Sequence, residues 1–150
     1  MQWTVLRPVA FFDNITPGLF GTVFCTSSEV VLEDKPLQLI AKRDNWVLYF
    51  AARAFLRPDE YHAQCLSLAG DELKFSDLER IFEEKTGQSL PLMSTFLCRL
   101  LHWASTELYT MYQWFRDSGY QADRCTAVKA KHPGLMDFSI WLEKERAWKS

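Results

Sequence analysis

The stretch that decides the fold is WTVLRPVAFFDN, residues 3–14. Residues 3–6 form a short, nearly continuous run of apolar and β-branched side chains, and Arg7-Pro8 ends it. Such a run is typical of a strand that is covered on both faces, as the strands of parallel sheets are. We therefore expect neighbouring strands, either in this chain or in a larger sheet to which the strand belongs.

The composition excludes several classes of protein. The 150 residues suffice for one domain with a core but not for two ordinary ones, so residues 1–150 are predicted to form a single domain. Hydrophobic residues make up 48% of the chain and aromatic residues 15%, which excludes a disordered segment. With 17 basic against 19 acidic residues and no basic stripe, direct nucleic-acid binding is not expected.

The cysteines indicate a reducing compartment. They are widely separated, and none stands in a C-x-x-C pair or at metal-ligand spacing with two histidines, so no metal site is predicted. The four are Cys25, Cys65, Cys98 and Cys125. No signal-peptide pattern is visible, and the interpretation is reduced thiols in a protein of the cytoplasm or nucleus.

Strands and helices alternate along the chain. Two further strands are predicted at Leu37–Ala41 and Gln64–Gly70, and the apolar spacing in residues 46–57 predicts a helix that Pro58 ends. Residues 11–24, with Pro17 and two glycines, suggest a short helix or turn. Strands separated by helices favour parallel pairing, so the predicted class is α/β.

The second half of the chain is predicted to be helical. Ser76 and Glu79 have the spacing of a capping box, and Gly87 stands where that helix should end. Between Met93 and Phe115 apolar residues recur every three or four positions, which fits one long helix or two consecutive ones. Three acidic or basic residues interrupt this stretch, so no membrane span is expected. They are Arg99, His102 and Glu107. Shorter helices are predicted before Lys131 and around Phe138, Trp141 and Leu142.

No catalytic residue can be nominated from a motif. The G-x-G-x-x-G fingerprint is absent, and the pair Gly18 and Gly21 in GLFG fits a turn better than a phosphate site. The Tyr-x-x-x-Lys pair of carbonyl-reducing short-chain dehydrogenases is also absent. Tyr49 with Arg53 has the spacing, as does Tyr120 with Arg124, but arginine stays charged and such pairs are usually surface contacts.

One segment has the character of a binding site. Pro8, directly after the first strand, fixes the backbone where the carboxyl end of a parallel strand opens onto a crevice. Phe11 and Phe12 could form an apolar wall, and Asp13 and Asn14 could hydrogen-bond to a ligand. The alternative is a helix N-terminus that Asp13 or Asn14 caps.

Several stretches together resemble the carboxyl-terminal half of NmrA-like proteins, which are atypical relatives of the short-chain dehydrogenases. The stretches are WTVLRPVAFFDNITPGLFG, KPLQLIA, FAARAFLRPDEYHAQCLSLAGDELKFSDLERIFEEKTGQSLP, WFRDSGYQAD and HPGLMDFSIWLEKE. The resemblance implies a partial Rossmann-type fold that binds NADP or NAD, with Phe11 to Asn14 beside the nicotinamide. The Gly-rich amino-terminal half of the family has no counterpart here, so cofactor binding by this chain alone is expected to be weak or absent.

Three functions remain open. The resemblance favours a redox-sensing or regulatory NAD(P)-binding protein that acts on a regulatory protein partner. One alternative is an NAD(P)H-dependent reductase of the same fold. The other is a non-catalytic interaction fragment that uses the aromatic helices between Leu92 and Phe115. Because unpaired strand edges associate readily, we also expect pairing with another chain or a second copy.

Overall fold

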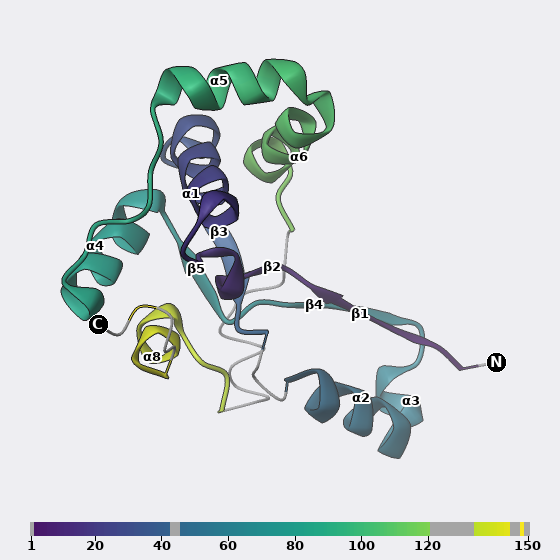
Figure 1. Cartoon of the computed structure of the whole chain (residues 1–150). Coiled ribbons are helices and arrows are strands. Elements are labelled where there is room, and N and C mark those ends of the chain that lie inside the picture. Colours follow the sequence, from purple (N-terminus) through teal and green to yellow (C-terminus); the bar gives the residue numbers. More distant parts are fainter. Residues whose placement is uncertain (1, 43–45, 121–133, 145–147, 149–150) are drawn as a thin grey trace.

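The computed structural model describes residues 2–42, 46–120, 134–144 and 148, and its architecture is mixed α/β (Figure 1). The strands are β1 (Thr4–Pro8), β2 (Ala10–Phe11), β3 (Leu37–Ile40), β4 (Gln64–Leu68) and β5 (Asp71–Leu73). The helices are α1 (Leu19–Leu32), α2 (Trp46–Leu56), α3 (Pro58–Tyr61), α4 (Phe75–Thr86), α5 (Thr95–Ala104), α6 (Thr106–Asp117) and α8 (Phe138–Lys144), with a 3₁₀ turn at Phe12–Asn14.

The described strands form two small sheets, a pair of β1 and β4 and a three-stranded sheet in the order β2-β3-β5. β1 pairs in parallel with β4, so that Pro8 lies opposite Leu68. One residue further on, β2 pairs in parallel with β3, and Phe11 lies opposite Ile40. The predicted parallel pairing is thus confirmed for all three expected strands. The antiparallel pairing of β5 with β3 was not predicted, because β5 has only three residues and no alternating pattern.

The helix α1 is longer than the sequence suggested. The predicted short helix or turn was wrong in extent, since α1 runs for 14 residues from Leu19 to Leu32. Gly18 precedes it with a φ of 102°, a conformation that favours glycine. A Cβ at Gly21 would clash with the carbonyl oxygen of Thr16, so α1 packs directly on the loop before it. Both glycines therefore have structural roles.

The helix α4 is confirmed, but its predicted cap is wrong. β5 leads almost directly into the helix, which begins at Phe75 after an extended Lys74, and no side chain caps it. Ser76 therefore lies inside the first turn instead of before it. Gly87 ends the helix as predicted, with a φ of 68° and its N–H donated to the Glu83 carbonyl.

The remaining helices largely follow the prediction. α2 ends at Leu56, and Pro58 begins the short α3. The segment between Met93 and Phe115 forms two helices, because the chain is extended at Ser105, whose hydroxyl accepts the Leu108 N–H. α8 buries the expected Phe138, Trp141 and Leu142, whereas the helix predicted before Lys131 lies outside the described residues.

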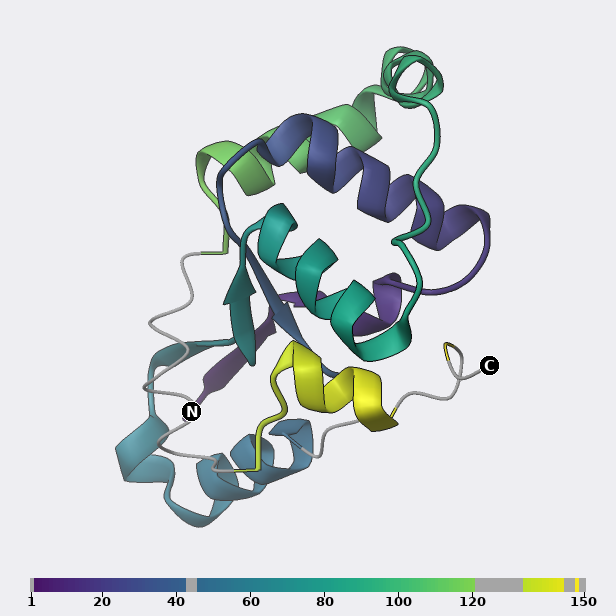
Figure 2. The same cartoon turned by 90° about the vertical axis from the view of Figure 1, so that its left-hand side faces the viewer.

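Two groups of buried side chains form the core. The larger one joins α1, α4, α6 and α8 to the sheet, and α4 and α8 lie side by side in Figure 2. The smaller one lies under β1 and β4 and consists of Val9, Ile40, Phe50, Leu68, Ala69 and Leu135. Burying each large apolar side chain contributes about 1.5–3 kcal/mol.

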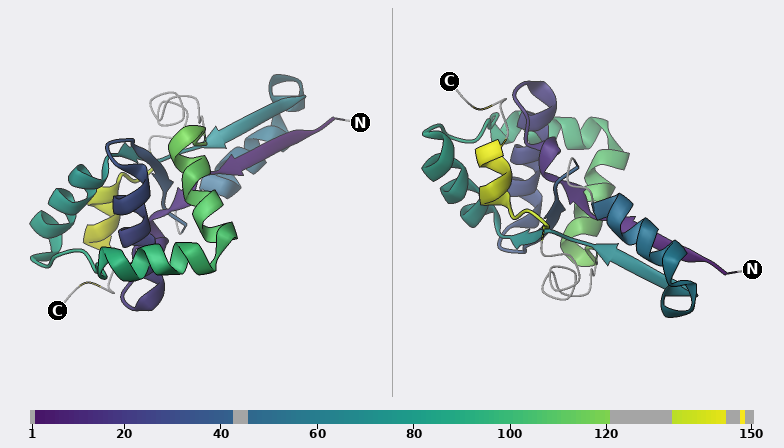
Figure 3. Two further views of the ribbon diagram at one scale, coloured as in Figure 1. Left: turned by 90° about the horizontal axis from the view of Figure 1, so that it is seen from above. Right: turned by 90° about the horizontal axis from the view of Figure 1, so that it is seen from below.

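The β1–β4 layer is covered on one face only by the described residues, which differs from the expected strand buried on both faces. Both views of Figure 3 show β1 and β4 projecting from the body with α2 and α3 alongside. Leu6 and Leu66 pack against the smaller core group, which includes Phe50 of α2. Val5, at an alternate position of β1, remains 39% exposed, and Trp3, directly before the strand, is 47% exposed. Within the described residues β1 pairs with β4 alone, so its second edge is unpaired.

Candidate functional site

The segment between Pro8 and Asn14 lies where two parallel strands end together. Phe11 closes β2 and Ile40 closes β3 in register, and the chain then turns into the 3₁₀ turn Phe12–Asn14. In open α/β sheets, ligands bind in the crevice outside the carboxyl ends of the strands. The fold therefore puts the predicted binding segment in a suitable position.

Asp13 holds the two strand ends together. Its Oδ2 accepts the backbone N–H of Lys42, just beyond β3, at 2.9 Å. Neither Asp13 nor Asn14 caps α1, whose N-cap is Gly18, so the alternative interpretation as a helix cap is wrong. Asn14 is half-buried, and no hydrogen bond of its side chain is found among the described residues.

The two phenylalanines of the segment differ in environment. The ring of Phe12 is fully buried, with its centroid 5.4 Å from Phe138 and 5.7 Å from Trp141. The side chain of Phe11 is half-buried and packs against the smaller core group. Pro8 is exposed at the end of β1. Of the two aromatic rings, Phe11 is the one that retains an accessible surface.

Sequence reasoning missed two contributors to this region. The Lys42 N–H follows a predicted strand directly, and parallel strands that end at one edge could have indicated its proximity to Asp13. Gly70 donates its N–H to the Leu39 carbonyl, and a Cβ there would lie 2.8 Å from the Met136 carbonyl oxygen. Glycine at the end of the predicted strand could have indicated this, because such a glycine often marks a place where another backbone segment approaches closely.

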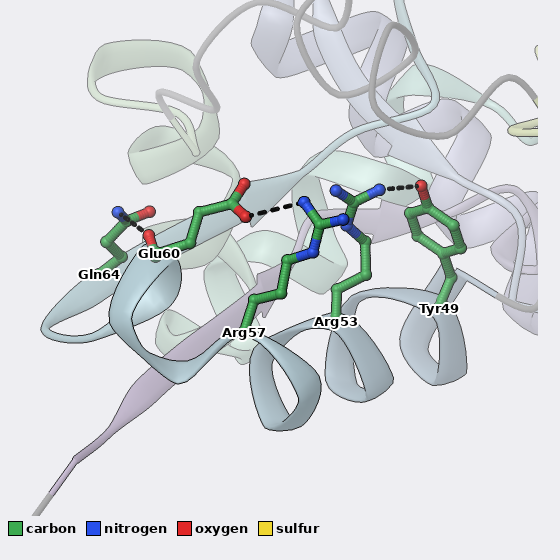
Figure 4. A network of polar contacts seen from close by, with 5 residues as sticks. All are labelled: Tyr49, Arg53, Arg57, Glu60 and Gln64. Atoms are coloured by element: carbon green, nitrogen blue, oxygen red, sulfur yellow. Dashed lines mark hydrogen bonds and ion pairs between the residues drawn. The ribbon is translucent and has the colours of Figure 1, made fainter.

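The tyrosine–arginine pair with dehydrogenase-like spacing lies along α2 (Figure 4). Arg53 donates to the Tyr49 hydroxyl at 2.8 Å, and this hydrogen bond is the main reason that the pKa of Arg53 is raised. Further along, Arg57 forms an exposed ion pair with Glu60. A permanently charged arginine cannot relay a proton as lysine does, so the contact orders the helix surface. Arg124, of the second such pair, lies outside the described residues.

The thiols within the described residues are all free. Cys25 and Cys98 are buried, and burial raises the pKa of Cys25 to about 12, so it is unreactive near neutral pH. Cys65 is exposed on β4. The nearby His62 accepts the backbone N–H of Trp3 through Nδ1 at 3.4 Å. Cys125 lies outside the described residues.

Among the residues that the structure describes, no three His, Cys, Asp or Glu side chains gather closely enough to hold a metal ion. The same residues include no helix with the length and apolar character needed to cross a bilayer.

Comparison with known proteins supports the fold class. The structure resembles the crystal structure of a nucleoside-diphosphate-sugar epimerase from Staphylococcus aureus, with a TM-score of 0.66 and 14% sequence identity. The match covers 95% of this chain and 52% of that protein, so the chain spans about half the length of the structure it matches. No family model and no curated protein matches the sequence. The likeness shows the fold of the chain, which is a mixed α/β, partial Rossmann-like fold.

Proposed function

We propose that this chain forms the nicotinamide side of an NAD(P)-binding protein with a redox-sensing or regulatory role, as its resemblance to NmrA-like proteins implies. The observation that carries the proposal is the position of Phe11 and Asn14 at the joint carboxyl end of β2 and β3. There a partly exposed aromatic ring stands close in sequence to an amide for which the described residues provide no hydrogen-bond partner. A nicotinamide ring needs a flat apolar surface and a hydrogen-bonding group for its carboxamide.

The described residues fit the nicotinamide end of the cofactor but not its pyrophosphate. A pyrophosphate requires exposed backbone N–H groups at a Gly-rich turn. The only G-x-x-G pair in the sequence is GLFG, and there Gly21 packs against Thr16. Bound NAD(P) would supply hydride chemistry, whereas Phe11 and Asn14 would orient its ring. Tight binding of the whole dinucleotide is therefore proposed to require a complementary Gly-rich half.

The free edge of β1 and the hollow beside it support a partner that carries this Gly-rich half. Beside β1 and α2 lies a hollow of ≈ 390 Å³ whose lining includes Leu6, Ala51 and Phe55. Phe55 is 86% exposed, and Trp3 at the other wall is 47% exposed. A strand added at the free edge of β1 would bring side chains into this hollow and cover both aromatic rings. The partner supplies the Gly-rich turn in this proposal.

Titration with two ligands, each representing one half of the cofactor, tests which half this chain binds. Reduced nicotinamide mononucleotide should give a saturable change in nicotinamide fluorescence, and ADP-ribose should not compete for the same site. Asn14→Ala should weaken this binding about tenfold, the effect of losing one well-formed hydrogen bond. Gln88→Ala removes an exposed amide elsewhere and should change nothing. Equal affinity of the two variants would reject the site.

A reductase activity would appear as oxidation of NADPH with carbonyl or quinone substrates. We propose regulation instead of reduction because no Tyr-x-x-x-Lys pair is present in the sequence. An interaction fragment remains a second candidate, since α5 exposes Phe96 and Trp103 by 77% and 83%. Failure of every nicotinamide probe, together with saturable capture of a protein at α5, would favour it.

A further inference from the structure

A second hollow lies between α1, α5 and α6, and none of its lining residues belongs to the Pro8–Asn14 segment. Its volume is ≈ 550 Å³, within the roughly 300–1,000 Å³ of small-molecule pockets. Its walls are positioned by the packing of three helices on one another (Figure 1). The lining residues are Val30, Val31, Arg99, His102, Trp103, Thr106, Tyr109 and Arg116.

An ordered histidine forms part of the pocket wall. His102 is only 6% exposed, and its Nε2 lies 2.9 Å from the Ser27 hydroxyl oxygen. The Sγ of Cys98 lies 3.9 Å from the same nitrogen, and the centroids of the His102 and Tyr109 rings lie 5.7 Å apart. Burial lowers the pKa of His102, so the imidazole is neutral at pH 7. These contacts fix the ring in one orientation at the edge of the pocket.

The Ser27–His102 pair does not form a nucleophilic site. The side chains of Ser27 and Cys98 are both fully buried, so a substrate in the pocket could not reach either oxygen or sulfur. The pocket is therefore suited to binding rather than to acyl transfer.

The charges of the lining favour an anion. Arg99 and Arg116 contribute two guanidinium groups, and the lining contains no carboxylate. Arg116 is paired with the adjacent Asp117 at 2.8 Å, whereas Arg99 is exposed and forms no ion pair with any described residue. The Arg99 guanidinium is thus the one charge of the lining without an ion pair among the described residues. A ligand with a single negative charge neutralises it, whereas a dianion would keep one unpaired negative charge.

The rest of the lining favours a flat apolar body. Val30, Val31 and Trp103 present apolar surface, and Tyr109 adds a second aromatic ring. We propose that this pocket binds a small aromatic carboxylate, with the carboxylate on Arg99 and the ring against Val30, Val31 and Tyr109. This ligand is distinct from the nicotinamide cofactor, and the inference does not depend on the proposed function.

Methyl NMR with 2-naphthoate tests the site directly. The valine methyl signals of Val30 and Val31 should shift saturably with 2-naphthoate, while those of Val5 on the distant β1 should not. The neutral 2-naphthamide should bind at least about tenfold more weakly, because it lacks the charge that Arg99 recognises. Tighter binding of naphthyl phosphate than of 2-naphthoate would overturn the assignment of a monoanion.

Two arginine variants provide the matched comparison. Arg99→Gln removes the exposed, unpaired cation and should weaken 2-naphthoate binding about tenfold without changing the rest of the spectrum. Arg80→Gln, on the exposed surface of α4, should bind 2-naphthoate as the unaltered chain does. Absence of a saturable shift at Val30 and Val31, or equal binding by both variants, would overturn the proposal.

Discussion

The backbone N–H of Lys42 donates to Oδ2 of Asp13 at 2.9 Å, across 29 residues of chain. This hydrogen bond joins the segment after β2 to the residue after β3, at the edge where both parallel strands end. Asp13 was predicted to contact a ligand, and in the structure it organises the backbone around the proposed nicotinamide position. Its contribution should therefore be measurable in the absence of any ligand.

Asp13→Ala should lower the free energy of unfolding by about 0.5–1.5 kcal/mol, because the exposed Lys42 N–H exchanges its carboxylate acceptor for water. Urea denaturation of both proteins gives the difference. Asp34→Ala, which removes an exposed carboxylate with no hydrogen bond among the described residues, is the control and should change stability by less than about 0.5 kcal/mol. If the two variants unfold at the same urea concentration, the Asp13 hydrogen bond does not stabilise the fold.

Phe12→Leu should destabilise the chain because the Phe12 ring packs against both Phe138 and Trp141 in the larger core group. A change of shape in a close-packed core costs about 1–3 kcal/mol. Phe20→Leu, at a position 64% exposed, should have an effect near zero. A Phe12 variant as stable as the Phe20 variant would contradict the assignment of Phe12 to the core.

His102 should make stability depend on pH. Burial lowers its pKa in the folded chain below the 6.5 of an exposed histidine, so the unfolded chain binds the proton more readily. The free energy of unfolding should therefore fall as the pH decreases below about 6.5, until the folded form is also protonated. The His102→Gln variant keeps a polar side chain but should lose the part of this pH dependence that comes from His102.

Urea denaturation at pH 7.5 and pH 5.5 isolates the effect, since the other titrating groups are common to both proteins. The unaltered chain should lose more stability between the two pH values than the His102→Gln variant. Identical losses in both would mean that His102 titrates as an exposed histidine does.

Cys65 should react much faster with a maleimide than Cys25 or Cys98, because it alone of the three is exposed and burial holds the pKa of Cys25 near 12. Mass spectrometry of a Cys125→Ser variant follows each site. Cys65 lies opposite Val5 on the uncovered layer, so a partner that covers this face should slow its labelling. Labelling of Cys25 at the rate of Cys65 would contradict the burial of α1.

The sequence predicted the parts of the fold that follow from local periodicity. The sequence predicted strands at Leu37–Ala41 and Gln64–Gly70 because polar residues bound apolar β-formers there. It predicted the end of α4 at Gly87 because a left-handed helix end favours glycine. The length of α1 was missed because it carries polar Thr26, Ser27 and Ser28 on buried positions, where their hydroxyls bond within the chain. The Asp13–Lys42 contact and the pocket at His102 depend on tertiary packing, which periodicity does not contain.

The account depends most on the claim that Phe11 and Asn14 face the nicotinamide ring. The most direct measurement is a ¹H–¹⁵N spectrum of the chain titrated with reduced nicotinamide mononucleotide. We predict saturable shifts of the Asn14 side-chain amide and of the backbone N–H groups of Phe11 and Lys42. Shifts confined to α5 and α6, with the Asn14 amide unchanged at saturation, would contradict it.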